Sequence, residues 1–216
     1  MKGKKLLFAL LLLGLVLPVT AQKNEKVEAR VQLARDRYAE GLNAIAEQKA
    51  YEKDGIPDIN YTTVVRKQNW PGSGMSTDKM EFYYQEVYDD EGIEMLGYAP
   101  LIIRRTYNMG SIEAFEEYVY DEDGNPLFWF TRYGYYEGKS YEFKVELRGY
   151  YAADGTLVRT ICKKAGENEE LKTCSVNDRV NEYDESTLEA QFGRALNNFG
   201  KLKTTFFSLY DTEYIH

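Results

Sequence analysis

The stretch 141-YEFKVELRGYY-151 decides the fold of this chain. From residue 141 to residue 148 its odd-numbered positions are apolar and its even-numbered positions are charged. Successive side chains of a β-strand point to opposite faces, so the alternation predicts a strand with one apolar and one charged face.

Further strands are predicted on both sides of this one. Aromatic and β-branched residues, which strands favour, fill residues 61–67, 79–88, 101–107, 112–120, 127–133 and 156–163. The run Leu127-Phe128-Trp129-Phe130 is apolar at consecutive positions, which is typical of a central strand covered on both faces. We expect an antiparallel meander of about seven or eight strands over residues 61–176.

The predicted strands are separated by similar turns. Gly92, Gly124 and Gly155 each end a short acidic segment that follows a tyrosine, and they lie 32 and then 31 residues apart. A glycine after acidic residues is typical of a hairpin turn that needs a positive φ. The repeat therefore predicts a meander built from similar hairpins.

Two amphipathic helices flank the predicted sheet. Residues 23–51 carry a stripe at helical spacing, formed by Val27, Val31, Ala34, Tyr38, Leu42 and Ile45. Residues 186–208 begin with a capping box, Ser186 to Glu189, and carry a second stripe formed by Leu188, Phe192, Ala195, Phe199, Leu202 and Phe206. Gly193 and Gly200 either let this helix approach the sheet or weaken it.

We therefore predict an α+β fold with two-layer packing of helices on a sheet, in a single domain over residues 22–216. We expect both helices on one face of the sheet, with the other face wholly or partly open to solvent.

Residues 1–21 are predicted to be a cleavable signal peptide. Lysines precede an apolar run over residues 6–17, and Val19-Thr20-Ala21 supplies small residues for cleavage. The run is shorter than the roughly 20 residues of a spanning helix, so we expect no membrane insertion after cleavage. The mature chain is expected in the periplasm or outside the cell.

Charge and residue usage exclude several function classes. Without the three lysines of the signal peptide, 24 basic and 35 acidic residues remain, a net charge of −11. Such a surface argues against nucleic acid as a partner. The single histidine, His216, is the last residue, a poor position for a catalytic or metal-binding imidazole.

No catalytic group, metal site or cofactor is predicted from the motifs. Asp121, Asp123 and Asn125 alternate as in a calcium loop, but Pro126 and Arg132 occupy the positions that require glycine and glutamate. A turn explains these residues better. Cys162 and Cys174 enclose a polar loop, and in an exported chain we expect a disulfide between them.

The leading functional expectation is a non-enzymatic binding or structural domain. Its ligand surface is predicted at a cluster of four aromatic residues flanked by glycines, where a β-bulge would turn successive rings to one side: Trp129, Tyr133, Tyr135 and Tyr136. The partner would be a glycan, a peptide or a protein. The competing interpretation is that these rings brace the sheet as cross-strand neighbours.

The alternative function is a carboxylate-dependent hydrolase acting on an extracellular polymer such as a glycan. Such enzymes need two carboxyl groups and no histidine. The chain has 35 acidic residues, so the sequence does not single out a pair.

Overall fold

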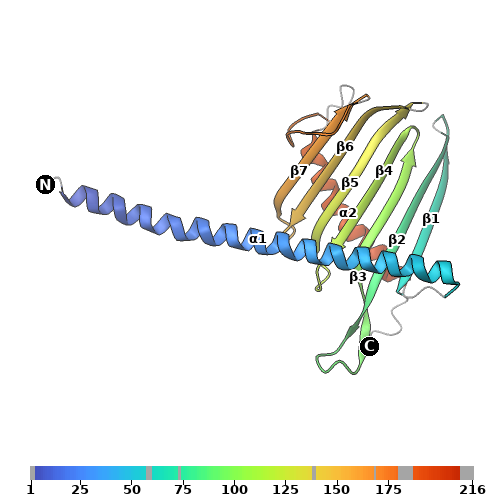
Figure 1. Cartoon of the computed structure of the whole chain (residues 1–216), viewed down its shortest axis with the longest axis horizontal. Helices are drawn as coiled ribbons and strands as arrows, with labels where there is room; N and C mark the ends of the chain where they lie inside the picture. The colour runs from blue at the N-terminus through green and yellow to red at the C-terminus, as the bar shows by residue number, and fades with distance from the viewer. Residues whose placement is uncertain are drawn as a thin grey trace.

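The computed structural model describes residues 3–56, 60–72, 74–137, 140–167, 169–179 and 187–209. The chain runs from one long helix through a sheet to a second helix (Figure 1). In order, the elements are α1 (Gly3–Asp54), β1 (Tyr61–Trp70), β2 (Gly74–Tyr88), β3 (Met95–Met109), β4 (Ile112–Tyr120), β5 (Pro126–Glu137), β6 (Ser140–Tyr151), β7 (Leu157–Gly166), β8 (Lys172–Thr173) and α2 (Leu188–Leu209). The predicted α+β fold is confirmed.

The sheet is an antiparallel meander in which spatial order follows chain order from β1 to β8. The predicted hairpin turns join its strands. Gly92, Gly124 and Gly155 have φ values of 68°, 72° and 82°, a backbone region in which a side chain is disfavoured. Each strand therefore pairs with the next along the chain, as the repeat of turns predicts.

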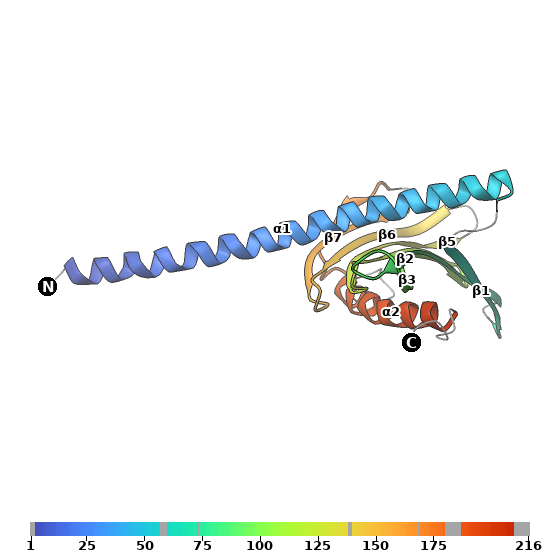
Figure 2. The ribbon, with the colours of Figure 1, turned by 90° about the horizontal axis from the view of Figure 1, so that it is seen from below.

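The two helices pack on opposite faces of the sheet (Figure 2). Val31, Ala34 and Ile45 of α1 share one core cluster with Ile102 and other strand residues. The buried residues of α2 form another cluster with strand residues of the opposite face. Each helix forms a two-layer packing with the sheet face that it covers. The expectation that both helices lie on one face is wrong.

The helices lie on opposite faces because the central strands are apolar on both sides. Ile102 faces α1 and its neighbour Ile103 faces α2, and Val119 and Tyr118 divide in the same way. One helix covers only one of these surfaces. Burying both requires a helix on each face.

The buried stripe of α1 differs from the prediction at one step. Leu42 is 39% exposed, whereas its neighbour Gly41 is buried. A Cβ atom on Gly41 would lie 2.9 Å from Cγ2 of Ile102, so α1 makes its close approach to the sheet at this glycine. Leu42 is turned outward as a consequence.

The helix α1 begins at Gly3 rather than near residue 23 and continues through the predicted signal peptide. Its first half extends beyond the sheet (Figure 1). Leucine and alanine, which are frequent in this segment, are strong helix formers, so the helix continues while the segment is attached. Among the described residues, no helix is long and apolar enough to cross a membrane.

The helix α2 buries the six residues of its predicted stripe. Its start at Leu188 lies close to the predicted one, but Ser186 of the capping box falls outside the described residues. Cβ atoms on Gly193 and Gly200 would meet nothing within 4 Å. The close approach instead occurs at Gly149 of β6, where a Cβ atom would lie 3.0 Å from the Phe192 ring.

Cys162 and Cys174 are free thiols in this structure, so the disulfide predicted from their spacing is not formed. The loop between them does close as a hairpin, but a backbone hydrogen bond holds it: the amide of Cys174 donates to the carbonyl of Cys162 at 3.1 Å. Burial raises the pKa of Cys162 to about 11.

Candidate binding site

The α1 face of the sheet is only partly covered. The helix crosses the strands near one end, and the other end of this face is left without a helix (Figure 1). Strand register shows which side chains project there, because residues directly opposite each other share a face. Two rows of side chains cross β4, β5 and β6 in this uncovered part.

In the first row Phe115 pairs with Arg132, which pairs with Glu146. In the second row Glu113 pairs with Gly134, which pairs with Lys144. Gly134 has no side chain, so the middle of the second row is missing between two long charged residues. This gap opens a depression in the sheet surface.

The depression is a hollow of about 530 Å³. We call it the strand-end hollow and define it by its lining: Thr106, Glu113, Ala114, Phe115, Arg132, Tyr133, Gly134, Lys144, Glu146 and Leu171. The side chains of Ala114 and Tyr133 point to the other face by alternation, so these two residues contribute the floor. Ligand pockets have volumes of about 300–1,000 Å³, and the hollow is of this size.

The charges around the hollow are partly neutralised. Glu146 forms an ion pair with Arg148 at 2.7 Å. Arg132 is exposed, and the described residues provide no carboxylate partner for its guanidinium. The guanidinium of Arg104 lies over the ring of Phe115, 5.2 Å from its centroid. The lining thus combines an apolar wall with a cation that is available to a ligand.

The boundary between the hollow and α1 is held by Glu117. This side chain is 1% exposed and accepts hydrogen bonds from Arg104 Nε at 2.9 Å and from the Tyr38 hydroxyl at 2.7 Å. Tyr38 belongs to α1, so this contact fixes where the helix lies on the sheet. Burial, followed by the Glu117 contact, raises the pKa of Tyr38 well above its usual value and keeps this hydroxyl a donor.

Of the aromatic residues predicted as a ligand surface, Tyr133 contributes to the floor of the hollow, and its side chain points to the α2 face. Trp129 is 2% exposed and packs edge-on against Phe192 of α2, 5.5 Å between ring centroids, so it is a core residue. Alternation explains this, because consecutive apolar positions in a strand supply both cores. Trp129 is therefore not a surface contact for a ligand.

Tyr133 and Tyr135 share the α2 face and both contact the ring of Phe143, at 6.4 and 6.5 Å between centroids. They are partly buried and brace neighbouring strands, as the competing interpretation predicted. The register does shift between Tyr135 and Tyr136, where a bulge was expected. The side chain of Tyr136 lies outside the described residues.

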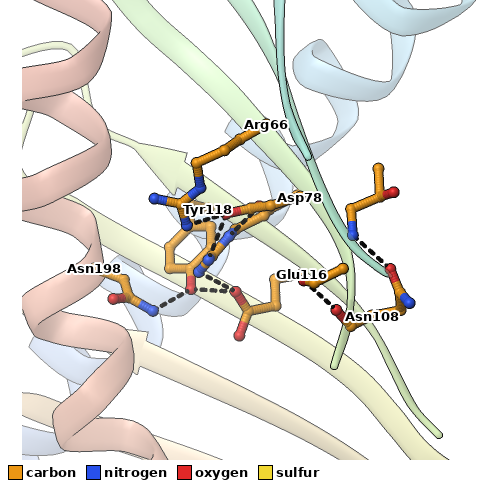
Figure 3. Close-up of polar contacts among 9 residues, drawn as sticks. Arg66, Asp78, Asn108, Glu116, Tyr118 and Asn198 are labelled. Carbon is orange, nitrogen blue, oxygen red and sulfur yellow. Dashed lines mark hydrogen bonds and ion pairs between the residues drawn. The ribbon is translucent and has the colours of Figure 1, made fainter. Parts of the chain in front are cut away.

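Two carboxylates meet on the α2 face in a network that we call the carboxylate network (Figure 3). Its members are Arg66, Asp78, Arg105, Glu116, Tyr118 and Asn198. Arg105 donates two hydrogen bonds to Asp78, at 2.8 and 3.0 Å, and forms an ion pair with Glu116 at 3.6 Å.

The carboxylate network has the character of a structural site. Asp78 and Glu116 are each 6% exposed, and one arginine binds both. Burial raises the pKa of Glu116, against the opposing effects of Tyr118 and Arg105. A hydrolase needs its two carboxyl groups on opposite sides of a substrate, and an arginine occupies that position here.

The acidic turns serve the fold. Asp121 forms an ion pair with Arg30 at 2.9 Å and accepts a hydrogen bond from the backbone amide of Asn125 at 2.7 Å. These contacts agree with the interpretation of this segment as a turn. Within the described part of the chain, no group of three or more His, Cys, Asp or Glu side chains is arranged to hold a metal ion.

Sequence reasoning missed the strand-end hollow. One signal was present, since Gly134 interrupts a strand at a position flanked by bulky residues, and an interior glycine often marks a close approach or a gap. The residues opposite it could not be identified without the register of three strands.

Comparison of the chain with protein-family models, with curated proteins and with solved structures found no match.

Proposed function

We propose that this chain is an exported, non-enzymatic binding domain that holds its ligand in the strand-end hollow. The observation that carries the proposal is the hollow itself, a depression of about 530 Å³ on a sheet face that has no helix over it. Apolar and charged side chains converge there from β3 to β6 and from the loop before β8. Mixed lining of this kind is typical of ligand sites.

The rigidity of the surrounding sheet supports this proposal. The floor of the hollow belongs to strands that are paired on both sides and packed against α2 through Val145 and Leu147. A site on paired strands is already formed before a ligand arrives, which lowers the entropic cost of binding.

A library of oligosaccharides and short peptides tests the proposal, with binding read as a thermal shift. Gly134→Leu places a side chain in the gap of the second row and fills the hollow, and we expect it to abolish the shift caused by any hit. Gly193→Ala is the matched control, because a Cβ atom there meets nothing within 4 Å. Hits that bind the Gly134→Leu variant as tightly as the parent would place the ligand elsewhere.

The hydrolase remains the second candidate, because Glu113 and Glu146 line the same hollow. The ion pair between Glu146 and Arg148 favours the binding function, since it occupies one of the two carboxylates. Release of reducing ends from a polysaccharide, lost in Glu113→Gln and in Glu146→Gln, would establish hydrolysis. Binding without release, unchanged over long incubation, supports the binding domain.

A further inference from the structure

We propose that the ligand of the strand-end hollow carries an oxyanion, a carboxylate or a phosphate, which Arg132 binds. This inference rests on the proposed function and specifies its ligand chemistry. Arg132 lies on β5 two residues before Gly134, on the same face of the sheet, and therefore borders the gap at this glycine. A guanidinium offers two parallel N–H donors, which match the two oxygens of such a group.

The balance of charge at the hollow supports an anion. Of its two acidic residues, Glu146 is neutralised by Arg148 at 2.7 Å. Lys163 is the cross-strand neighbour of Glu146 on its other side and adds a further positive charge. Glu113 is the other acidic residue of the described lining, and among the described residues Arg132 has no carboxylate partner, so an anionic ligand meets an available cation there.

The position of the hollow indicates a small ligand rather than an added peptide strand. A peptide that binds by strand addition needs a free sheet edge, and β3 to β6 are each paired on both sides. Recognition must therefore come from side chains. Phe115 and Leu171 can contact an apolar part, and Thr106 can hydrogen-bond a hydroxyl group.

Three probes that share one sugar ring separate the possibilities: glucose, glucuronate and glucose 6-phosphate. Each is titrated into isotope-labelled protein at matched ionic strength, and amide resonances are followed by NMR. We expect glucuronate, glucose 6-phosphate or both to shift amides of residues 113–115, 132–134 and 144–146. The neutral sugar should bind at least about tenfold more weakly, because it lacks the charge-assisted hydrogen bonds.

Two arginine variants test the role of Arg132. Arg132→Gln should weaken binding of the anionic probe by at least about tenfold and leave binding of glucose unchanged. Arg35→Gln, at an exposed position of α1, is the control and should bind like the parent. A stronger response to carboxylate or to phosphate identifies which oxyanion the site takes.

The outcomes separate the inference from the proposed function. Equal binding of glucose and the anions in the hollow, blocked by Gly134→Leu, overturns the inference and leaves the binding domain standing. Absence of shifts at the hollow with both anions overturns the inference as well. Shifts that persist in Gly134→Leu contradict both.

Discussion

At Gly41 the absence of a side chain sets the distance between α1 and the sheet. A Cβ atom there would lie 2.9 Å from Cγ2 and 3.0 Å from Cβ of Ile102. Ile102 is fully buried, so it has little room to move. Gly41→Ala should therefore destabilise the fold by about 1–3 kcal/mol through overpacking, even though alanine is the better helix former by about 1 kcal/mol.

Urea denaturation measures this effect, and Gly193→Ala is its control. A Cβ atom on Gly193 of α2 meets nothing within 4 Å, so we expect that variant to be more stable than the parent by up to about 1 kcal/mol. If Gly41→Ala also stabilises, the helix does not contact Ile102 as closely as the structure shows.

At Glu116 the expected effect depends on pH. Burial raises its pKa above the ordinary value of 4.5, so folding favours the protonated carboxyl group. The contribution of Glu116 to the free energy of unfolding is fully present below the pKa that its carboxyl group has in the unfolded chain. It is lost as the pH rises through the pKa of the folded state. The parent should thus lose stability relative to Glu116→Gln, which cannot ionise, as the pH rises above 4.5. Urea titrations across this range measure the difference, and parallel profiles would contradict it.

Among the elements, α1 is attached to the sheet by a polar anchor as well as by its apolar stripe. Arg30 forms an ion pair with Asp121 at 2.9 Å and donates to the carbonyls of Tyr151 at 2.8 Å and Pro126 at 3.1 Å. Arg30→Ala would leave the buried Asp121 without its cation, and we expect a loss of about 2 kcal/mol in unfolding free energy.

A second arginine gives the matched comparison for Arg30. Arg159 of β7 forms an ion pair with Glu28 of α1, the helix that also carries Arg30. This pair is exposed to solvent. Exposed ion pairs contribute little, so Arg159→Ala should unfold at the same urea concentration as the parent. Equal losses in the two variants would show that Arg30 is not an anchor.

The helix α2 depends on its buried aromatic residues. Phe199 is 1% exposed and contacts the rings of Tyr118, Tyr120 and Tyr151. Phe199→Asp should cost more than about 4 kcal/mol, because it removes these contacts and buries an unpaired charge. Leu196→Asp, at a position 36% exposed, should cost much less. Similar melting of the two variants would contradict the packing of α2.

The elements themselves were predictable because their signals are local. Alternation from residue 141 to residue 148 and the turn glycines depend on neighbours in sequence, and both predictions were confirmed. The placement of α1 and α2 is non-local and was predicted wrongly. The apolar run Leu127–Phe130 contained the clue, since a strand that is apolar on both faces needs a cover on each.

For the whole molecule, the candidate site was less predictable than the fold. Trp129, Tyr133 and Tyr135 lie close together in sequence, but Trp129 belongs to the α2 core, and Tyr133 and Tyr135 contact Phe143 of the neighbouring strand. The strand-end hollow depends on the register of three strands and on where α1 crosses them. Neither feature is encoded within a short window of sequence, so the local density of aromatic residues did not identify the hollow.

The whole molecule also carries a prediction about export. Within the described part of the chain, the sheet contacts of α1 involve residues from Val27 onward, and the preceding helix extends beyond the sheet. We expect cleavage between Ala21 and Gln22, which would leave Arg30, Gly41 and the rest of the packed stripe in the mature chain. Residues 22–216 should therefore unfold with the same free energy as the precursor, within about 0.5 kcal/mol.

Two measurements check this prediction. The intact mass and the N-terminal sequence of protein from an exporting cell locate the cleavage, and urea denaturation compares the precursor with residues 22–216. Ala21→Leu is a matched variant, because a large side chain at the cleavage site should block processing and leave the fold intact. A mature chain that retains residues 6–17 would refute cleavage. A mature chain much less stable than the precursor would instead show that the first part of α1 belongs to the fold.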